Sequence, residues 1–100
     1  MIPLFVYSTL LDSDLVKKII GRKPTETKDT LVNYRIKEEK GYAWLEWHKG
    51  SFVHGKVLEL TREEMDKTDD WESKYKRTPF KLDSGMSAWA YELRDHLKGK

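Results

Sequence analysis

The sequence predicts an α+β domain in which a small, mixed and strongly curved β-sheet or barrel carries two flanking helices. Three observations point to this fold class. Strand-like segments outnumber helical ones, both helical segments carry their own start signals, and segment 52–60 does not sort into one apolar and one polar face. A curved sheet with Gly55 at a bend explains that mixed pattern. The 100 residues are expected to form one domain over 1–100.

The first predicted unit is a strand, a loop and a helix. Residues 4–7 form a continuous apolar run, which is typical of a strand buried on both faces. The stretch 12–14, Asp-Ser-Asp, favours a helix start. Apolar residues then recur at helical spacing across 15–20, and Gly21 takes the usual position after a helix C-terminus.

Two turns divide the next part of the chain into three predicted strands. The strand-like segments are 31–36, 42–47 and 52–60. Gly41 separates the first two, and a turn is expected at 48–50 between the second and the third. A polar loop is expected before the first of these strands.

A second helix is predicted from Thr61 to about 67–70. Thr61 and Glu64 have the spacing of a capping box, in which each side chain accepts a hydrogen bond from the other residue's backbone. Such a box marks the start of a helix without any help from tertiary contacts.

A hairpin and a short tail are predicted for the rest of the chain. The hairpin strands cover 75–82 and 86–93, and the turn signal Asp-Ser-Gly at 83–85 joins them. The polar and basic residues at about 96–100 are expected to fray.

The composition favours a soluble, cytoplasmic protein. No segment resembles a signal peptide, none approaches the about 20 apolar residues of a membrane-spanning helix, and there is no cysteine. The net charge of +2 argues against a nucleic-acid partner. A charged fraction of 36%, with no Gln and a single Asn, is common in thermophile proteins. A hot habitat is therefore a hypothesis, and a melting temperature in the ordinary mesophile range would end it.

Six short motifs follow one another along almost the whole chain. They are Leu4-Phe5-Val6-Tyr7-Ser8-Thr9-Leu10, Gly41-Tyr42-Ala43, Val53-His54-Gly55-Lys56-Val57, Thr68-Asp69-Asp70-Trp71-Glu72, Tyr75-Lys76-Arg77 and Ala88-Trp89-Ala90-Tyr91. With them the chain resembles the γ-glutamylcyclotransferase-like family, in the compact form sometimes called butirosin-biosynthesis-like. The family has Tyr-Gly-Thr-Leu, Gly-Tyr-Pro, Val-x-Gly-x-Val, Leu-Asp-x-x-Glu and Tyr-x-Arg at the first five places.

The resemblance implies a small β-barrel with flanking helices and a cavity between the first loop and the acidic motif. It also implies a reaction that needs no cofactor, in which a small γ-glutamyl amine or peptide closes on itself and releases oxoproline. Glu72 would be the general base and acid. The substrate loop would comprise Tyr7, Ser8, Thr9 and Leu10, and Tyr75 and Tyr91 would line the cavity.

The residue types suit that chemistry. A carboxylate with a raised pKa can take a proton from an ammonium group and return it to a leaving amine. Trp71 and Tyr75 are expected to form an apolar wall beside Glu72, and desolvation would raise its pKa. Backbone N–H groups of the loop 7–10 could stabilise an oxyanion. That loop leads into the helix at about Asp12 and could also hold a substrate carboxylate, because a helix N-terminus favours anions.

Four positions depart from the family pattern. Ala43 replaces proline, Thr68 replaces leucine, Ser73 stands where glycine commonly follows the glutamate, and Ser8 replaces a glycine. Serine at position 8 would be costly if the backbone there needs a positive φ. The alternative function is therefore a non-catalytic module on the same fold that binds a small acidic metabolite or a partner protein.

Other chemistries fit the sequence less well. A serine hydrolase would need a Gly-x-Ser-x-Gly elbow and a triad order, and neither is present. His48 and His54 would lie about 20 Å apart on a strand with no third ligand, so no metal site is predicted. The four tryptophans are interpreted as core residues rather than as stacking platforms.

Overall fold

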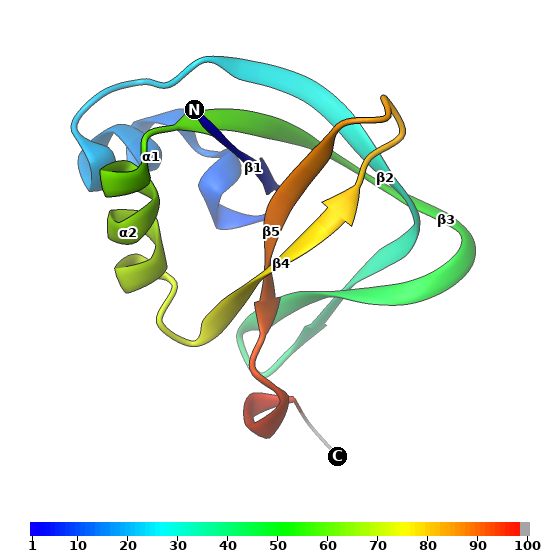
Figure 1. Cartoon of the computed structure of the whole chain (residues 1–100). Helices are drawn as coiled ribbons and strands as arrows, with labels where there is room; N and C mark the ends of the chain where they lie inside the picture. Colours follow the sequence, from blue (N-terminus) through cyan, green and yellow to red (C-terminus); the bar gives the residue numbers. More distant parts are fainter. Residues whose placement is uncertain (99–100) are drawn as a thin grey trace.

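The computed structural model describes residues 1–98 and contains a five-stranded sheet with two α-helices (Figure 1). The elements are β1 (Ile2–Val6), the 3-10 helix η1 (Thr9–Leu11), α1 (Ser13–Ile20), β2 (Glu26–Glu39), β3 (Tyr42–Leu60), α2 (Arg62–Trp71), β4 (Tyr75–Lys81), β5 (Ser87–Leu93) and the 3-10 helix η2 (Asp95–Leu97). The strand order is β2-β3-β1-β5-β4, and only the central β1–β5 pair is parallel. The prediction of an α+β fold with a mixed sheet and two helices is confirmed.

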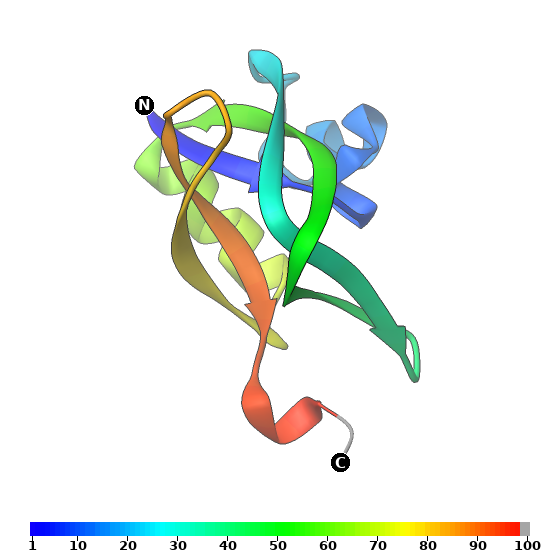
Figure 2. The same cartoon turned by 90° about the vertical axis from the view of Figure 1, so that its right-hand side faces the viewer.

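The sheet is strongly curved and open. Strands β2 and β4 are its two edges, but the curl brings β2 against the β4–β5 turn (Figures 1 and 2). The Asp83 N–H donates to the Thr30 carbonyl at 2.8 Å, and the Ser84 hydroxyl donates to the Asp29 carboxylate at 2.5 Å. Within residues 1–98 no strand ladder joins the two edges, so the curved sheet is realised and the closed barrel is not.

Two hydrophobic cores lie on opposite faces of the sheet. Leu4 and Val6 of β1 face the helices, while Phe5 and Tyr7 face the concave interior of the curl. The helix-side core comprises Leu4, Val6, Leu10, Val16, Ile20, Leu58, Leu60, Met65 and Tyr91. The concave core comprises Phe5, Tyr7, Leu31, Leu45, Val53, Val57, Leu82, Ala88 and Ala90. The apolar run 4–7 is thus buried on both faces, as its sequence predicts.

The predicted turn at 48–50 is wrong, because β3 runs unbroken through it. Asn33 of β2 lies opposite the stretch 48–51, and the regular register resumes on either side. Asn33 (φ 68°) and Gly50 (φ 88°) adopt left-handed backbone conformations, and the Gly50 N–H donates to the Asn33 side-chain oxygen at 3.0 Å. The glycine therefore marks a bulge-like irregularity that bends the strand pair without ending it.

Both predicted helices are present with their predicted caps. Asp12 caps α1 at its N-terminus, and Gly21 follows it with φ 89°. The capping box of Thr61 and Glu64 opens α2, which ends at Trp71. Neither described helix combines the length and the apolar character needed to cross a membrane. Of the tail expected to fray at about 96–100, residues 96 and 97 belong to η2, and 99–100 lie outside the described residues.

The tryptophans only partly follow their predicted role. Trp44 is 5% exposed and belongs to the interior. Trp47 and Trp71 are 62% and 56% exposed, so the interpretation as core residues is wrong for both. Trp89 is half-buried, and the Arg77 guanidinium lies 5.2 Å from its ring centroid.

Candidate active site

A cavity of about 270 Å³ is walled by the end of β1 and the loop after it, the C-terminal end of α2, the start of β4 and the tip of the β2–β3 hairpin. Its lining residues are Phe5, Val6, Tyr7, Ser8, Thr9, Leu10, Glu38, Gly41, Tyr42, Ala43, Glu72, Tyr75 and Tyr91. All seven residues that the sequence analysis expects at the site or in the cavity wall are among them. The fold therefore brings together expected residues as far apart in the sequence as Tyr7 and Tyr91, which are 84 positions apart.

Glu72 lies at the point where α2 ends. Its N–H donates to the Thr68 carbonyl, and its own carbonyl accepts from the Tyr75 N–H, both at 2.9 Å. The backbone is thus held on both sides of the residue. Burial raises the pKa of the Glu72 carboxyl above its usual value, and the Thr9 side chain acts in the opposite direction. Among the carboxyl groups of residues 1–98, Glu72 is the one with a raised pKa, and it lines the cavity.

The loop 7–10 enters the cavity wall through a tight turn. The first hydrogen bonds of η1 run from the Leu11 N–H to the Ser8 carbonyl at 3.0 Å and from the Asp12 N–H to the Thr9 carbonyl at 3.2 Å. Thr9 and Leu10 come before Leu11, the first residue whose N–H donates within the turn. Their own N–H groups therefore have no carbonyl acceptor in the turn. Ser8 has φ −139°, which is outside the left-handed region. Serine in place of glycine therefore meets no positive-φ requirement here.

Tyr7 contributes its ring to the cavity wall. Its hydroxyl donates to the Tyr91 carbonyl at 2.6 Å, and the residue is 7% exposed. Burial raises the pKa of the phenol, so it stays neutral in the physiological range. The hydroxyl is thus engaged within the protein.

Tyr75 links two walls of the cavity. Its hydroxyl oxygen accepts a hydrogen bond from the Ala43 N–H at 3.3 Å, which fastens the hairpin tip to the start of β4. Burial raises its pKa, and the nearby Glu72 carboxylate acts in the same direction. Tyr75 therefore connects Glu72 with the hairpin that carries Gly41, Tyr42 and Ala43.

A polar network braces the end of α2 one turn before Glu72. The Tyr91 hydroxyl donates to the Asp69 carboxylate at 2.6 Å and lies 2.8 Å from the Thr68 hydroxyl. The Arg77 guanidinium pairs with the same carboxylate at 3.0 Å. Asp69 therefore ties the helix to both strands of the β4–β5 hairpin.

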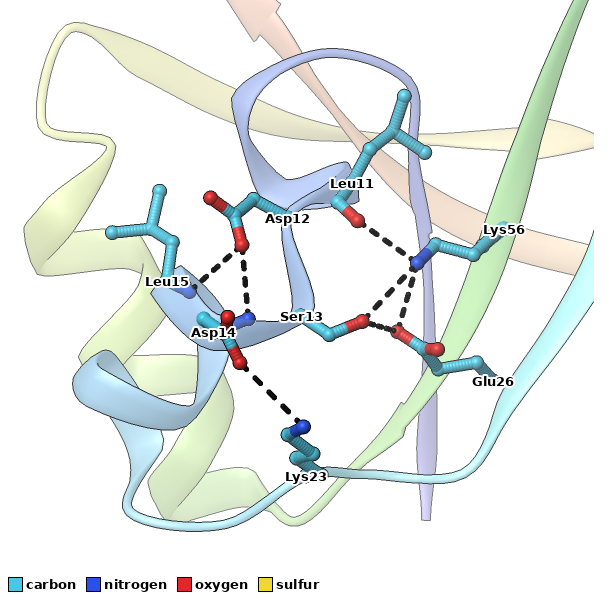
Figure 3. Close-up of polar contacts among 8 residues, drawn as sticks. All are labelled: Leu11, Asp12, Ser13, Asp14, Leu15, Lys23, Glu26 and Lys56. Atoms are coloured by element: carbon cyan, nitrogen blue, oxygen red, sulfur yellow. Dashed lines mark hydrogen bonds and ion pairs between the residues drawn. The ribbon is translucent and has the colours of Figure 1, made fainter.

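The N-terminus of α1 is occupied by its own capping carboxylate, so the loop 7–10 would have to hold a substrate carboxylate without help from this helix end. The Asp12 carboxylate accepts from the N–H groups of Asp14 at 2.9 Å and Leu15 at 3.3 Å (Figure 3). The residue that caps the helix supplies the negative charge that a ligand would otherwise bring.

Trp71 does not form the apolar wall expected beside Glu72. Its exposed ring lines a groove between α1 and α2, while the rings that face the cavity belong to Phe5, Tyr7, Tyr42, Tyr75 and Tyr91. Consecutive residues of a helix point about 100° apart, so the neighbours Trp71 and Glu72 diverge.

Glu38 is the cavity residue that the sequence motifs do not identify. It lies near the end of β2, next to the hairpin tip, and is exposed. Glu38 and Glu72 give the lining two carboxylates, while the lining residues include no Lys, Arg or His. No group of three potential metal ligands occurs among residues 1–98.

Comparison with known proteins identifies the family of this chain. The model of the family "Gamma-glutamyl cyclotransferase, AIG2-like" matches residues 4–100. The chain belongs to that family. No match to a curated protein sequence was found.

Solved structures share the fold at low sequence identity. The Arabidopsis thaliana protein At5g39720.1 has a TM-score of 0.80 at 22% identity, over 99% of this chain and 75% of its own. At3g28950.1 from the same plant has a TM-score of 0.82 at 21% identity, over 97% of this chain and 64% of its own. A structure named gamma-glutamyl cyclotransferase has a TM-score of 0.78 at 15% identity, over 93% of this chain and 66% of its own. The chain thus spans 64% to 75% of the length of these proteins.

Proposed function

We propose that this protein is a γ-glutamyl cyclotransferase that releases oxoproline from a small γ-glutamyl amine or peptide. The observation that carries the proposal is the position of Glu72, a carboxylate with a raised pKa that lines the same cavity as the loop 7–10. Membership of the family supports the same reaction class.

In the proposed reaction the α-amine of the γ-glutamyl group attacks its own γ-carbonyl carbon. Glu72 takes a proton from the α-ammonium group, whose pKa of about 8 otherwise keeps it protonated and non-nucleophilic. The new C–N bond closes a five-membered lactam. As the bond to the leaving amine breaks, protonated Glu72 returns the proton to that amine. No water and no cofactor is consumed.

Two features of the cavity support this sequence of steps. The N–H groups of Thr9 and Leu10 lack acceptors in their own turn and are the candidate donors to the developing oxyanion. The tyrosine and phenylalanine rings confine a small, folded substrate, which brings the amine and the carbonyl together. The contribution of Tyr7 is its ring, since its hydroxyl is bonded to Tyr91.

The charge of the lining predicts that the charge of the leaving amine affects binding. Glu38 at the hairpin and Glu72 favour cationic groups, and backbone N–H groups would have to hold a substrate carboxylate. The substrate panel therefore contains γ-glutamyl derivatives with cationic, neutral and acidic leaving amines.

The test is mass-spectrometric detection of oxoproline from that panel, with the wild type, Glu72→Gln and Glu63→Gln. Glu63 is an exposed glutamate in the first turn of the same helix and serves as the matched control. We expect product from the wild type and the control and none from Glu72→Gln with its fold intact. Thermal stabilisation by γ-glutamyl compounds without any product would instead support the non-catalytic binding module.

A further inference from the structure

Two consecutive residues of β3 contact the two ends of the loop 7–10. At the loop's start, the Gly55 backbone lies against β1. A Cβ added to Gly55 would overlap the Val6 carbonyl oxygen and come within 2.8 Å of the Phe5 ring. At the loop's end, the Lys56 ammonium donates to the Leu11 carbonyl at 2.9 Å (Figure 3).

The Lys56 ammonium also contacts two side chains, those of Glu26 and Ser13. It lies 2.9 Å from the Glu26 carboxylate and 3.5 Å from the Ser13 hydroxyl, and that hydroxyl donates to Glu26 at 2.9 Å (Figure 3). The ammonium thus has one acceptor for each of its three protons. The side chains of Lys56 and Glu26 are 21% and 30% exposed, so solvent screens the pair less than it screens a fully exposed one.

The contact with Leu11 acts on the turn that shapes the cavity wall. Leu11 is the last residue of η1, whose two hydrogen bonds fix the conformation of Ser8, Thr9 and Leu10. Asp12 then begins the cap of α1. A charged donor on the Leu11 carbonyl is expected to fix this turn better than water would, since hydrogen bonds to ionised groups are about twice as strong as neutral ones.

We propose that Lys56 is a positioning residue for the loop 7–10, which it holds in the cavity wall through the Leu11 carbonyl with Glu26 as its support. Lys56 is not among the cavity-lining residues, so it acts through the loop and not on a ligand. The consequence for catalysis rests on the proposed function, but the consequence for loop order does not.

Lys28 supplies a matched control. It pairs directly with Lys56 across the β2–β3 ladder and is exposed. Removing its charge changes the same part of the sheet but none of the contacts at Leu11. A general effect of losing one lysine from this surface would appear in both variants.

The experiment compares Lys56→Met, Lys56→Arg and Lys28→Met by amide hydrogen exchange at Leu11 and Asp12, by thermal unfolding and by turnover. We expect Lys56→Met to speed exchange at these two amides by roughly tenfold or more, with the melting temperature close to that of wild type. Lys56→Arg should restore slow exchange, and Lys28→Met should not change it. Turnover by Lys56→Met should fall roughly 10- to 100-fold, mainly in kcat, because a misplaced loop weakens transition-state contacts more than ground-state binding.

Unchanged exchange at Leu11 and Asp12 in Lys56→Met would overturn the proposal. If that variant does not fold, Glu26→Gln replaces it, and a smaller acceleration at the same two amides is expected. Unchanged exchange there would count equally against the proposal. The exchange measurement needs no substrate. If the wild type forms no oxoproline, the proposed function is contradicted. The exchange rates at Leu11 and Asp12 would still decide whether Lys56 positions the loop.

Discussion

The Arg22 guanidinium makes two contacts with the Glu64 carboxylate, at 2.5 Å from Nε and 2.7 Å from Nη2. The pair joins the segment after α1 to the first turn of α2. The same carboxylate closes the capping box by accepting from the Thr61 N–H at 2.9 Å. Glu64 is 8% exposed, so this is a largely buried acid whose partners compensate its desolvation.

The Arg22–Glu64 pair should make stability fall at acid pH. The Arg22 side chain holds the pKa of Glu64 at about 2, below its ordinary value of 4.5. A lowered folded-state pKa means that the stabilisation is complete above about pH 4.5 and is lost as the pH falls towards 2. Arg22→Met should lower the free energy of unfolding at pH 7 by about 1.5–3 kcal/mol, measured by urea denaturation.

The control for that pair is Lys23→Met. Lys23 lies 3.5 Å from the exposed Asp14 carboxylate, and such a surface pair contributes about 0–1 kcal/mol. Equal losses in Arg22→Met and Lys23→Met would contradict the assigned role of the buried pair.

Glu72 should reduce stability at neutral pH. Its pKa is raised by burial, so the folded state favours the protonated acid. The stability linked to that proton is complete below pH 4.5 and is lost as the pH rises through the folded-state pKa. Glu72→Gln should therefore be at least as stable as wild type at pH 7, and its advantage should shrink below pH 4.5. Calorimetry at the two pH values measures this, and a variant less stable at pH 7 would refute it.

Asp69 and Tyr91 should be energetically coupled, because both belong to the network that includes Arg77. Tyr91→Phe removes the donor 2.6 Å from Asp69, and Asp69→Asn removes the charge that faces Arg77. Each single variant should lose about 1–2 kcal/mol of unfolding free energy. The double variant should lose less than the sum by about 0.5 kcal/mol or more, because both changes affect one network.

Asp70→Asn is the matched control for Asp69→Asn. Asp70 is the exposed neighbour on the same helix and should change stability by no more than about 0.5 kcal/mol. Strict additivity in the Asp69–Tyr91 cycle would show that the two residues act independently.

Gly55→Ala should destabilise the sheet. The new methyl group would overlap the Val6 carbonyl oxygen and approach two carbons of the Phe5 ring at 2.8 and 2.9 Å. Neither the central strand nor the buried ring can retreat easily, so we expect a loss of about 1–3 kcal/mol in thermal or chemical unfolding. Gly50→Ala tests a different cause, since open space surrounds Gly50 and only its left-handed backbone opposes a side chain. An unchanged Gly55→Ala protein would mean that β1 and β3 can separate at this point.

Local sequence signals predicted much of the fold, and the motifs predicted which residues meet. Caps and turn glycines act within a few residues, so both helices and the β4–β5 hairpin could be located from the chain alone. The turn at 48–50 could not be distinguished from a bulge. A left-handed glycine serves both, and only the register with β2 decides between them.

The unpredicted parts of the site depend on long-range geometry. No local sequence signal identifies Glu38 as a cavity residue. An exposed glutamate on an edge strand has the same sequence pattern whether or not the strand ends beside a cavity. Arg22 and Glu64 are 42 residues apart, and nothing near either one indicates the other. The sequence places Trp71 next to Glu72 and so predicts that both face the cavity, but the helix end turns the two side chains apart.

The irregularity at Asn33 and Gly50 divides the β2–β3 hairpin into a near part, 26–32 with 52–60, and a far part, 34–47. The near part belongs to the sheet that supports Gly55 and Lys56, while the far part carries Glu38 and the tip residues around Tyr42 over the cavity. Substitutions in the far part change the cavity wall at the hairpin tip and leave the Lys56 contacts with Leu11 and Glu26 in place. Under the proposed function, the amine that the cavity accepts would therefore depend on the hairpin tip, while Glu72 and the loop 7–10 would carry the chemistry.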